Sequence, residues 1–573
     1  MKRQNKIKRP VFYMLCLAGL TFGNACTDDF KNINTHPNYL DPAKVDLTAL
    51  LQKPQEGIIP SGINMFQYWS NLHVDFFSGY CMGSHSFGGS NNYNYRLRGD
   101  FNHGPFENYY LNVLHYTREY TPVCKETGRL ELAAISQISQ VLGMLTVVDT
   151  YGPSPYRSSI EGSPTSYYDD DRQIYNDLFQ QIDEAIEWLI SFNENPTADN
   201  EKRLKDFAAA DKINRGNVEK WIRMANTLRL RMAMRIVKAE PVLAQQIAED
   251  AVNSKYGILK MEDEDCALVG GFCLRSIEDD WGDSRTNANL ICILRGYFDP
   301  RLPKFVQPVG TIYDEAGEEI DIAQLDSREL IDGKLYVGIR QGVPIDAKDG
   351  HWYLNYSRTN LSRNENRVVM RPAEGFFLRA EGALRGWNMN GTAKDLYAEG
   401  IRSAFKSVGI TDETVVYNYI IGELYADPDY WDNMEGGLRS APYINYRDPK
   451  YNVTDPNELN NVSVRWHDSD SRELKLQRIM TQKWLALYPN SFEAWAEYRR
   501  TGYPKLMEVA GDNLSNGTID SKIQIRRLPF TEKEYNTNTI EALNATKYLD
   551  GPDNGGTRIW WDVDNTGKAE PNF

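Results

Sequence analysis

Cysteine and histidine are scarce in this sequence, with seven of each among 573 residues. No two cysteines form a C-x-x-C pair, so neither a disulfide framework nor a zinc ribbon is predicted. The histidines are scattered without the spacing that zinc ligands need. Because Cys266, Cys273 and Cys292 have apolar neighbours, we expect them to be buried free thiols.

Signatures of catalysis and nucleotide binding are also missing. The sequence has no H-E-x-x-H, G-x-S-x-G, Walker phosphate loop or G-x-G-x-x-G, so metalloprotease, α/β-hydrolase and nucleotide-binding classes lack their motifs. A basic footprint occurs only in the first nine residues, and the formal charge is −15. We therefore expect no nucleic-acid partner. A glycosidase needs only two suitably spaced carboxylates, so that class is not excluded.

A basic N-terminus followed by one apolar run indicates export. The apolar run from Val11 to about Phe22 is too short to span a bilayer, and with the preceding lysines and arginines it predicts a signal peptide over residues 1–25. The run ends in Gly23-Asn24-Ala25-Cys26, which resembles the lipobox of bacterial lipoproteins. Cys26 is the predicted lipid attachment site, with simple cleavage nearby as the alternative. We expect residues 26–45 to be a lipidated tether and 46–573 to be a single domain.

Helical periodicity comes in pairs along the rest of the chain. Four pairs are predicted: 129–149 with 171–191, 217–238 with 242–253, two helices within 372–407, and 471–488 with 491–500. Tetratricopeptide-like hairpins, with a repeat of about 34 residues, show this pairing. The predicted fold is mainly α, with about four such helical hairpins in a solenoid-like bundle.

Three long segments do not follow the helical period, at about 50–102, 254–370 and 410–470. They are rich in glycine, asparagine, aspartate and aromatic residues, and the whole chain contains 34 Tyr, 21 Phe and 12 Trp. Long loops on a rigid scaffold are where binding residues concentrate. We expect these irregular insertions to carry the ligand face.

Several segments together resemble one known family. They are TQKWLALYPNSFEAWAEYRRTGYPKL (481–506), NVEKWIRMANTLRLRMAMRI (217–236), FFLRAEGALRGW (376–387), RRLPF (526–530), CTDDFKNINTHPN (26–38), DTYGPSPY (149–156) and TRIWWD (557–562). In the order in which they occur along the chain, these segments resemble the SusD/RagB family, the outer-membrane nutrient-binding lipoproteins of Bacteroidetes. The resemblance covers nearly the whole mature chain.

The resemblance implies a tetratricopeptide-like fold and no catalysis. No cofactor is predicted. The resemblance also implies a lipid-anchored protein on the outer membrane that faces the cell exterior and delivers an oligosaccharide or another nutrient to a SusC-like TonB-dependent transporter. A surface glycan hydrolase and a peptide- or protein-binding helical-repeat protein are the alternatives. A loop-bound calcium ion at Asp562 is an unsupported alternative, because the position of the closing glutamate holds Phe573.

The aromatic residues of the family-like segments are not predicted to bind ligand. Trp484, Trp495 and Tyr498 recur at helical spacing, which is typical of a buried helix face. Arg499 and Arg500 precede Thr501-Gly502, and we expect them to bond carbonyl groups at a helix C-terminus.

Loop aromatics are the better candidates for a glycan site. A sugar ring needs an exposed aromatic face flanked by polar side chains, and the loops at 278–285, 351–353 and 87–98 have this chemistry. The candidate ligand-binding residues are Trp281, Asp280 and Arg285 in the first loop, Trp352 and Tyr353 in the second, and Asn92, Tyr93, Tyr95 and Arg96 in the third. The alternative for each loop is an aromatic residue folded onto the scaffold. Spacing does not choose among the three loops.

Overall fold

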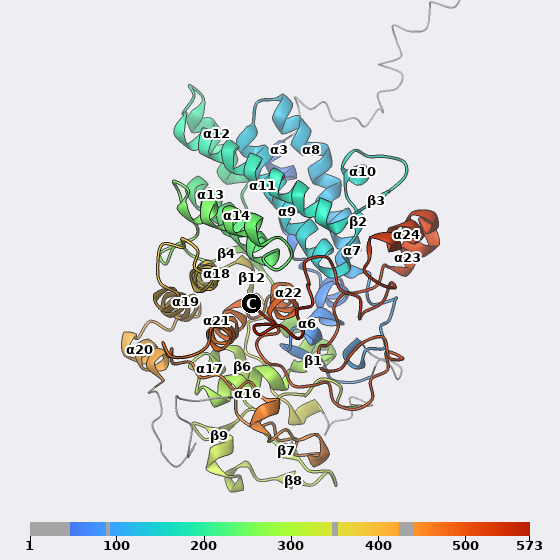
Figure 1. Cartoon of the computed structure of the whole chain (residues 1–573), viewed down its shortest axis with the longest axis vertical. Coiled ribbons are helices and arrows are strands. Elements are labelled where there is room, and N and C mark those ends of the chain that lie inside the picture. The colour runs from blue at the N-terminus through green and yellow to red at the C-terminus, as the bar shows by residue number, and fades with distance from the viewer. Residues whose placement is uncertain (1–45, 87–91, 346–352, 423–439) are drawn as a thin grey trace, which may run out of the picture. The chain divides into compact units, whose positions relative to one another are not determined.

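Four helix pairs form the centre of the structure, a computed structural model that describes residues 46–86, 92–345, 353–422 and 440–573 (Figure 1). The pairs are α9 (Leu130–Tyr151) with α11 (Asp171–Glu194), α13 (Val218–Arg235) with α14 (Pro241–Asn253), α18 (Pro372–Leu384) with α19 (Ala393–Ser407), and α21 (Arg472–Leu487) with α22 (Ser491–Thr501). Successive pairs pack together, since α11 contacts α13, α13 contacts α18 and α18 contacts α21. The prediction of a mainly α fold with four helix pairs is confirmed, and Leu47–Phe573 form one compact unit.

Polar caps determine where most of these helices begin. In each case the side chain before the helix accepts a hydrogen bond from a backbone N–H of the first turn, which would otherwise lack a partner. The capping residues are Asp170, Asn217, Thr392, Ser471 and Asn490. Pro241 opens α14, where its missing N–H costs no hydrogen bond.

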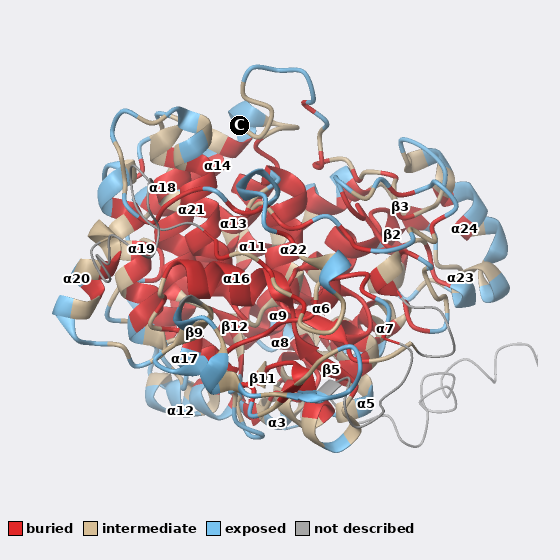
Figure 2. Ribbon diagram, turned by 90° about the horizontal axis from the view of Figure 1, so that it is seen from below, coloured by how far each residue is buried: buried red, intermediate tan, exposed pale blue. Residues whose placement is uncertain are grey.

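Helix α9 lies in the core. It is the one helix among the described residues that is long and apolar enough to cross a membrane, and 94% of its apolar stretch is buried inside the protein. It contacts α4 (Gln52–Ile58), α8 (His115–Glu126) and α11, so burial on several sides accounts for its composition. Figure 2 shows the buried residues in the central helices, whereas much of α12 (Asn200–Ala210), α23 (Glu532–Thr537) and α24 (Thr539–Ala545) is exposed.

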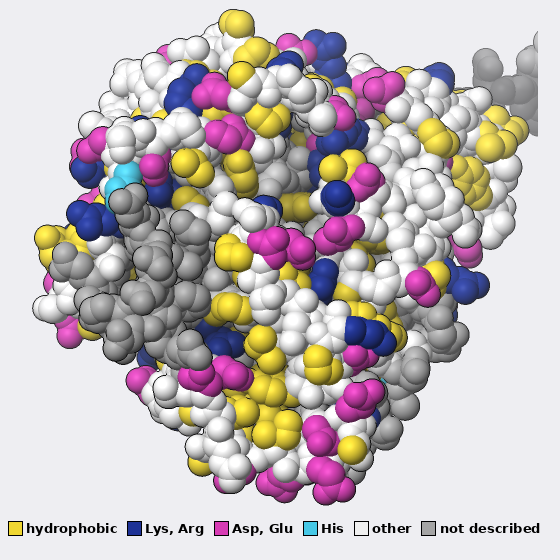
Figure 3. All heavy atoms as spheres, turned by 60° about the horizontal axis from the view of Figure 1, so that its bottom comes forward, with side chains coloured by type: hydrophobic (Ala, Val, Ile, Leu, Met, Phe, Trp, Pro, Cys, Tyr) yellow, Lys and Arg dark blue, Asp and Glu magenta, His cyan; other side chains and the backbone are white. Residues whose placement is uncertain are grey.

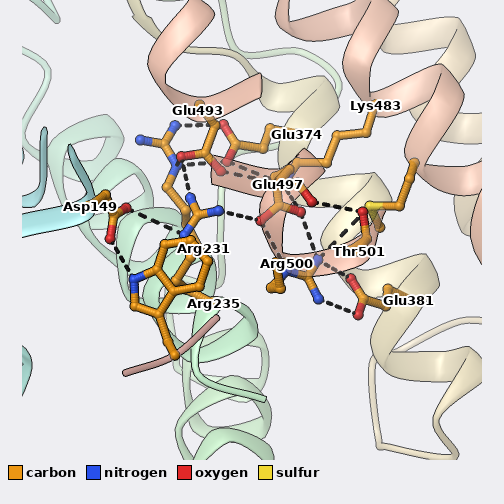
Figure 4. A network of polar contacts seen from close by, with 12 residues as sticks. Asp149, Arg231, Arg235, Glu374, Glu381, Lys483, Glu493, Glu497, Arg500 and Thr501 are labelled. Atoms are coloured by element: carbon orange, nitrogen blue, oxygen red, sulfur yellow. Dashed lines mark hydrogen bonds and ion pairs between the residues drawn. The ribbon is translucent and has the colours of Figure 1, made fainter. Parts of the chain in front are cut away.

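A network of buried ion pairs joins α13 to α18 and α22 (Figure 4). Arg231 donates two hydrogen bonds to Glu374 of α18, at 2.7 and 2.6 Å. Arg235 donates to Glu493 and Glu497 of α22, at 2.7 Å each. A buried charge is costly unless it is paired and hydrogen-bonded, so these contacts fix how the helices pack against one another.

Arg500 extends this network from the end of α22. It donates to Glu381 of α18 at 2.7 and 2.6 Å and to Glu497 at 2.6 Å. The expectation that Arg500 bonds helix carbonyls is wrong, because its buried charge is matched by carboxylates instead. Arg499 does donate to a carbonyl group, that of Arg526, at 2.8 Å. Trp484, Trp495 and Tyr498 are buried, as predicted.

The segments predicted to be irregular contain many short elements. Helices of four to seven residues make only one or two turns, which is too few to show a period of 3.6 in the sequence. Segment 50–102 contains α4, α5 (Ile63–Phe66), η2 (Gln67–Asn71), α6 (Val74–Phe77), β1 (Cys81–Gly83) and η3 (Asn92–Asn94). Segment 254–370 contains α15 (Leu274–Ser276), η5 (Ile277–Trp281), α16 (Ala288–Gly296), α17 (Leu302–Phe305) and most of the strands, and segment 410–470 contains α20 (Glu413–Ile421).

The described strands form two-stranded antiparallel pairs. In the pair of β1 with β5 (Ser284–Thr286), Cys81 lies opposite Thr286 and Gly83 opposite Ser284. In a longer pair, β4 (Cys266–Gly271) lies beside β12 (Asn366–Met370). The remaining pairs are β2 (Ser154–Pro155) with β3 (Tyr168–Asp169), β6 (Val306–Gln307) with β11 (Arg358–Thr359), β7 (Ile312–Tyr313) with β8 (Glu319–Ile320), and β9 (Leu330–Ile331) with β10 (Lys334–Leu335). The pairs β1–β5, β4–β12 and β6–β11 join segments from distant parts of the chain, whereas the other three pairs are local.

Candidate ligand-binding site

Strand β5 is hydrogen-bonded to segments that lie next to the other two candidate loops in the chain. On one side it pairs with β1, which leads into the segment around Asn92. On the other side the N–H of Thr286 donates to the carbonyl of Ser357 at 3.1 Å, in the segment that follows Tyr353. The loop that contains Trp281 runs directly into β5. The structure therefore connects the turn that contains Trp281 to segments next to the other two candidate loops.

Trp281 lies on a short, well-anchored turn. It ends η5, a single turn of π-helix, and the next residue, Gly282, adopts the left-handed conformation with φ of 66° that favours glycine. Asp283 holds the turn, since it accepts from the side chain of Gln67 at 2.7 Å and lies 3.1 Å from the ring of His85. The indole of Trp281 is half-buried and packs against the core. Part of the indole therefore stays accessible to solvent, on a turn that Asp283 holds in place.

Charged side chains surround this turn. Asp280 accepts two hydrogen bonds from Arg363, at 2.9 and 2.7 Å. Asp279 accepts from Arg275 at 2.7 Å and from Arg358 at 3.0 Å. The side chains of Asp280, Arg358 and Arg363 are 45%, 41% and 53% exposed. We call Trp281, Asp279, Asp280, Arg358 and Arg363 the Trp281 site.

Two more charged residues lie beneath the Trp281 site. Glu278 is buried, and one of its carboxylate oxygens accepts from the N–H of Thr359 at 2.9 Å. Burial raises the pKa of Glu278 to about 8, although the charge of Arg285 acts in the opposite direction. Arg285 itself is only 2% exposed and donates to the carbonyl of Ser284 at 2.7 Å. The structure thus places Arg285 below the surface that the other residues of this loop present.

The third candidate loop mostly points inward. Tyr93 and Tyr95 are buried, and the ring of Tyr93 lies against that of Phe76. Asn92 is buried too, and its amide donates to the carbonyl of Leu72 at 2.7 Å. Of the candidates in this loop, Arg96 is the exposed one.

Other predicted positions are only partly described. Cys26 and Trp352 lie outside the described residues. Tyr353 begins the short helix η8 (Tyr353–Asn355), and the structure describes its backbone alone. Whether these residues attach lipid or contact a ligand stays a prediction.

Sequence analysis missed Arg358 and Arg363. They lie about eighty residues after Trp281 in the chain, and the side-chain contacts to Asp279 and Asp280 arise only in the folded protein. A weak signal was available, since both arginines flank the polar stretch that follows Tyr353.

A separate cleft of about 760 Å³ lies on the other side of the loop 358–366. It is bounded by the start of α13, the end of α19, the acidic loop 261–265 and strands β4 and β12. Its aromatic lining residues, Phe305 and Tyr488, are buried, so among the described residues it offers no open aromatic face. On the face drawn in Figure 3, groups of hydrophobic side chains alternate with acidic and basic ones.

The first carboxylate of the loop that begins at Asp562 is already paired with arginines. The carboxylate of Asp562 accepts from Arg526 at 2.7 and 2.5 Å and from Arg558 at 2.8 Å. Guanidinium groups therefore take the positions that a cation would need. Across the described ranges, no group of three or more histidine, cysteine, aspartate or glutamate side chains is placed to hold a metal ion.

The fold and the site define a protein of stacked helical hairpins, with a half-buried aromatic residue on a turn that carries exposed charges. A family model described as SusD-like, "Susd and RagB outer membrane lipoprotein", matches residues 31–562. The chain belongs to this family of outer-membrane lipoproteins. The family resemblance of the sequence and the predicted outer-membrane location are confirmed.

Solved structures of the same family share the fold. A chitin-binding SusD homolog from Flavobacterium johnsoniae is 32% identical with a TM-score of 0.78, and the match covers 92% of this chain and 100% of that one. A SusD homolog from Bacteroides uniformis is 32% identical (TM-score 0.74; 90% and 99% covered) and one from Bacteroides vulgatus is 30% identical (TM-score 0.75; 92% and 98% covered). These matches confirm the tetratricopeptide-like architecture. No curated protein is significantly similar to the sequence.

Proposed function

We propose that this protein captures an oligosaccharide at the Trp281 site, on the cell surface, and delivers it to a SusC-like TonB-dependent transporter. The observation that carries the proposal is the half-buried indole of Trp281 on a well-anchored turn, with the exposed side chains of Asp280, Arg358 and Arg363 bonded to that turn or part of it. The similar structure from Flavobacterium johnsoniae is of a chitin-binding protein, which supports a glycan as the ligand class.

The chemistry of the site suits a sugar ring. One face of a pyranose carries C–H groups that stack on an aromatic ring, and its edge carries hydroxyls that need hydrogen-bond partners. Asp280, the neighbour of Trp281 in the chain, and Arg363, which bonds to Asp280, offer acceptors and donors for such hydroxyls. Ligand binding orders few groups at this site, because Asp283 already holds its turn. The ligand is released readily, because much of the charged surface around the turn stays solvated.

Capture without cleavage is the role we propose. The carboxyl group with a strongly raised pKa near the site, that of Glu278, is the kind of group that acts as a general acid in glycosidases. It is buried beneath Thr359, however, and does not reach a ligand on the indole. Lipid attachment at Cys26 would hold the protein at the outer membrane, beside the transporter that receives the sugar.

Calorimetric titration of the purified protein with a panel of oligosaccharides tests the proposal, and chitin oligosaccharides are the first choice. Trp281→Ala should weaken binding of the best ligand about tenfold, since it removes the stacking face. Trp387→Ala is the matched control, because Trp387 is also half-buried against the core but lies beyond α18. Product formation is followed in every mixture.

Binding without products, weakened only by Trp281→Ala, supports capture at this site. Release of reducing ends at a catalytic rate would instead make the protein a surface hydrolase. Failure to bind any oligosaccharide would refute a glycan ligand and favour a peptide or protein partner.

A further inference from the structure

We propose that the Trp281 site selects oligosaccharides that carry an acidic group, a carboxylate or a sulfate ester, and that Arg358 is the residue that binds it. This inference rests on the proposed function and narrows its substrate class. It is carried by the hydrogen-bond donors and charges that the described residues leave available around Trp281.

Arg358 has unused donors at the surface. Its guanidinium makes one hydrogen bond, from Nη1 to Asp279 at 3.0 Å, while the side chain is 41% exposed. Its Nε and Nη2 groups have no acceptor among the described residues. These two N–H groups form one edge of the planar guanidinium, and that edge matches the two oxygens of a carboxylate or sulfate.

Arg363 adds a second cation beside it. It gives its Nη1 and Nη2 groups to Asp280 and Asp279, and its Nε has no acceptor among the described residues. At 53% exposure it can turn toward an incoming anion, because the ion pair with Asp280 is itself solvated and weak. Arg363 would then exchange the carboxylate of Asp280 for the acidic group of the ligand.

The charges of the site do not cancel. Three guanidinium groups, those of Arg275, Arg358 and Arg363, share two carboxylates, those of Asp279 and Asp280. Of the other two acidic residues of the turn, Glu278 has its pKa raised to about 8 by burial and is mostly neutral at pH 7, and Asp283 bonds to Gln67 and lies 3.1 Å from the ring of His85.

Among the described residues of the loop 358–366, Glu365 does not remove this local excess. Glu365, on the same loop as Arg363, accepts from the backbone N–H groups of Ser362 and Asn366 and lines the cleft on the other side of the loop. The chain as a whole carries a formal charge of −15, but charges more than about 8 Å away are largely screened at physiological salt. The local arginines therefore decide the preference for an anion.

The test compares three oligosaccharides of equal length in calorimetric titrations: a neutral one, a hexuronate and a sulfated one. We expect the wild-type protein to bind at least one acidic ligand about tenfold more tightly than the neutral one, and to lose most of this preference between 50 and 500 mM NaCl. Arg358→Gln should lower the affinity for the acidic ligand about tenfold more than for the neutral one. Arg358→Lys keeps the charge without the planar edge and should restore only part of the preference.

Arg157→Gln is the matched control. Arg157, on α10 (Arg157–Ile160), is 46% exposed and, like Arg358, is paired with an aspartate, in its case Asp177 through two bonds of 2.6 and 2.7 Å. Its loss should change no affinity. The hexuronate and sulfate arms tell which acidic group the site prefers.

Equal, salt-independent binding of neutral and acidic ligands, with no selective effect of Arg358→Gln, would overturn this inference and leave the proposed function intact. Absence of binding for all three ligands and for the neutral panel would overturn the proposed function itself. A preference for the acidic ligand that Arg157→Gln reduces as much as Arg358→Gln does would also overturn the role given to Arg358.

Discussion

Arg500 is fully buried and holds two helices together through carboxylates on each. Removal of its charge leaves Glu381 and Glu497 with fewer partners inside the protein. Burial by itself raises the pKa of Glu497, but the charges of Arg500, Lys483 and Arg235 outweigh it and hold that pKa well below its ordinary value. The network is therefore ionised at neutral pH and depends on each cation.

We expect Arg500→Met to destabilise the protein by about 3 kcal/mol or more, because a buried carboxylate loses its partner. Urea unfolding at pH 7 measures this change in the free energy of unfolding. Arg402→Gln is the control: its pair with Glu413 is solvated, and its loss should cost no more than about 1 kcal/mol. Equal effects of the two substitutions would contradict the account of the network.

Glu278 should make the stability of the protein fall as the pH rises, opposite to the effect of a carboxylate such as Glu497, whose pKa is lowered by neighbouring cations. Its pKa rises from 4.5 to about 8 on folding, chiefly by burial. A group whose pKa is higher in the folded state contributes stability that is fully present below its unfolded pKa and is lost as the pH rises toward the folded value. The loss should fall between about pH 4.5 and 8, at about 1.4 kcal/mol per pH unit.

Glu278→Gln should remove that slope and make the protein more stable than the wild type at pH 8. Urea unfolding at pH 5, 6.5 and 8 follows the difference between the two proteins. Glu413→Gln, at an exposed carboxylate, should keep the slope of the wild type. Parallel curves for wild type and Glu278→Gln would show that Glu278 is not protonated in the folded state.

At the residue scale, chemistry could be predicted but exposure could not. Trp281 and Asp280 were named from the sequence and lie at an accessible turn. Tyr93, Tyr95 and Arg285 are likewise aromatic or charged candidates, but they are buried. Polar, glycine-rich surroundings do not tell which way a side chain turns, because that depends on neighbours far away in the sequence.

At the scale of elements, the long helices follow from periodicity and capping. The predicted 217–238 became Val218–Arg235, with Asn217 as its cap, and 471–488 became Arg472–Leu487, with Ser471 as its cap. The pairing of β1 with β5 could not be predicted, since strands of three residues carry no readable pattern and no signal of register.

Gly338 is where the site depends most directly on close contact between elements. It lies beside the residues that follow β5, and a Cβ at this position would lie 2.5 Å from the backbone N of Ala288 and the carbonyl carbon of Asn287. Backbone atoms cannot move aside cheaply. Gly338→Ala should therefore cost about 1–3 kcal/mol of stability and also weaken ligand binding, since it displaces the segment beside β5.

Gly310→Ala is the matched control for this substitution. A Cβ at Gly310 would meet no heavy atom within 4 Å, and its backbone is not left-handed. Thermal unfolding compares the stability of the two variants, and calorimetric titration compares their affinity for the ligand. A harmless Gly338→Ala would mean that the backbone beside β5 is looser than the structure shows.

At the scale of the whole molecule, the family resemblance predicted more than the periodicity did. The segments that carry the resemblance include Glu381, Glu493 and Arg500, which form the buried network. They identify the scaffold for that reason and say little about the ligand. The ligand surface lies on loops that need only stay compatible with this scaffold, so its geometry came from the structure alone.

The central claim is that the ligand binds at the Trp281 site, and a crystal structure of the protein with its best oligosaccharide tests it most directly. Our account predicts a sugar ring stacked on the indole of Trp281, with hydrogen bonds to Asp280, Arg358 or Arg363. A sugar bound instead in the cleft between α13, α19 and the β4–β12 pair, with Trp281 uncovered, would contradict it.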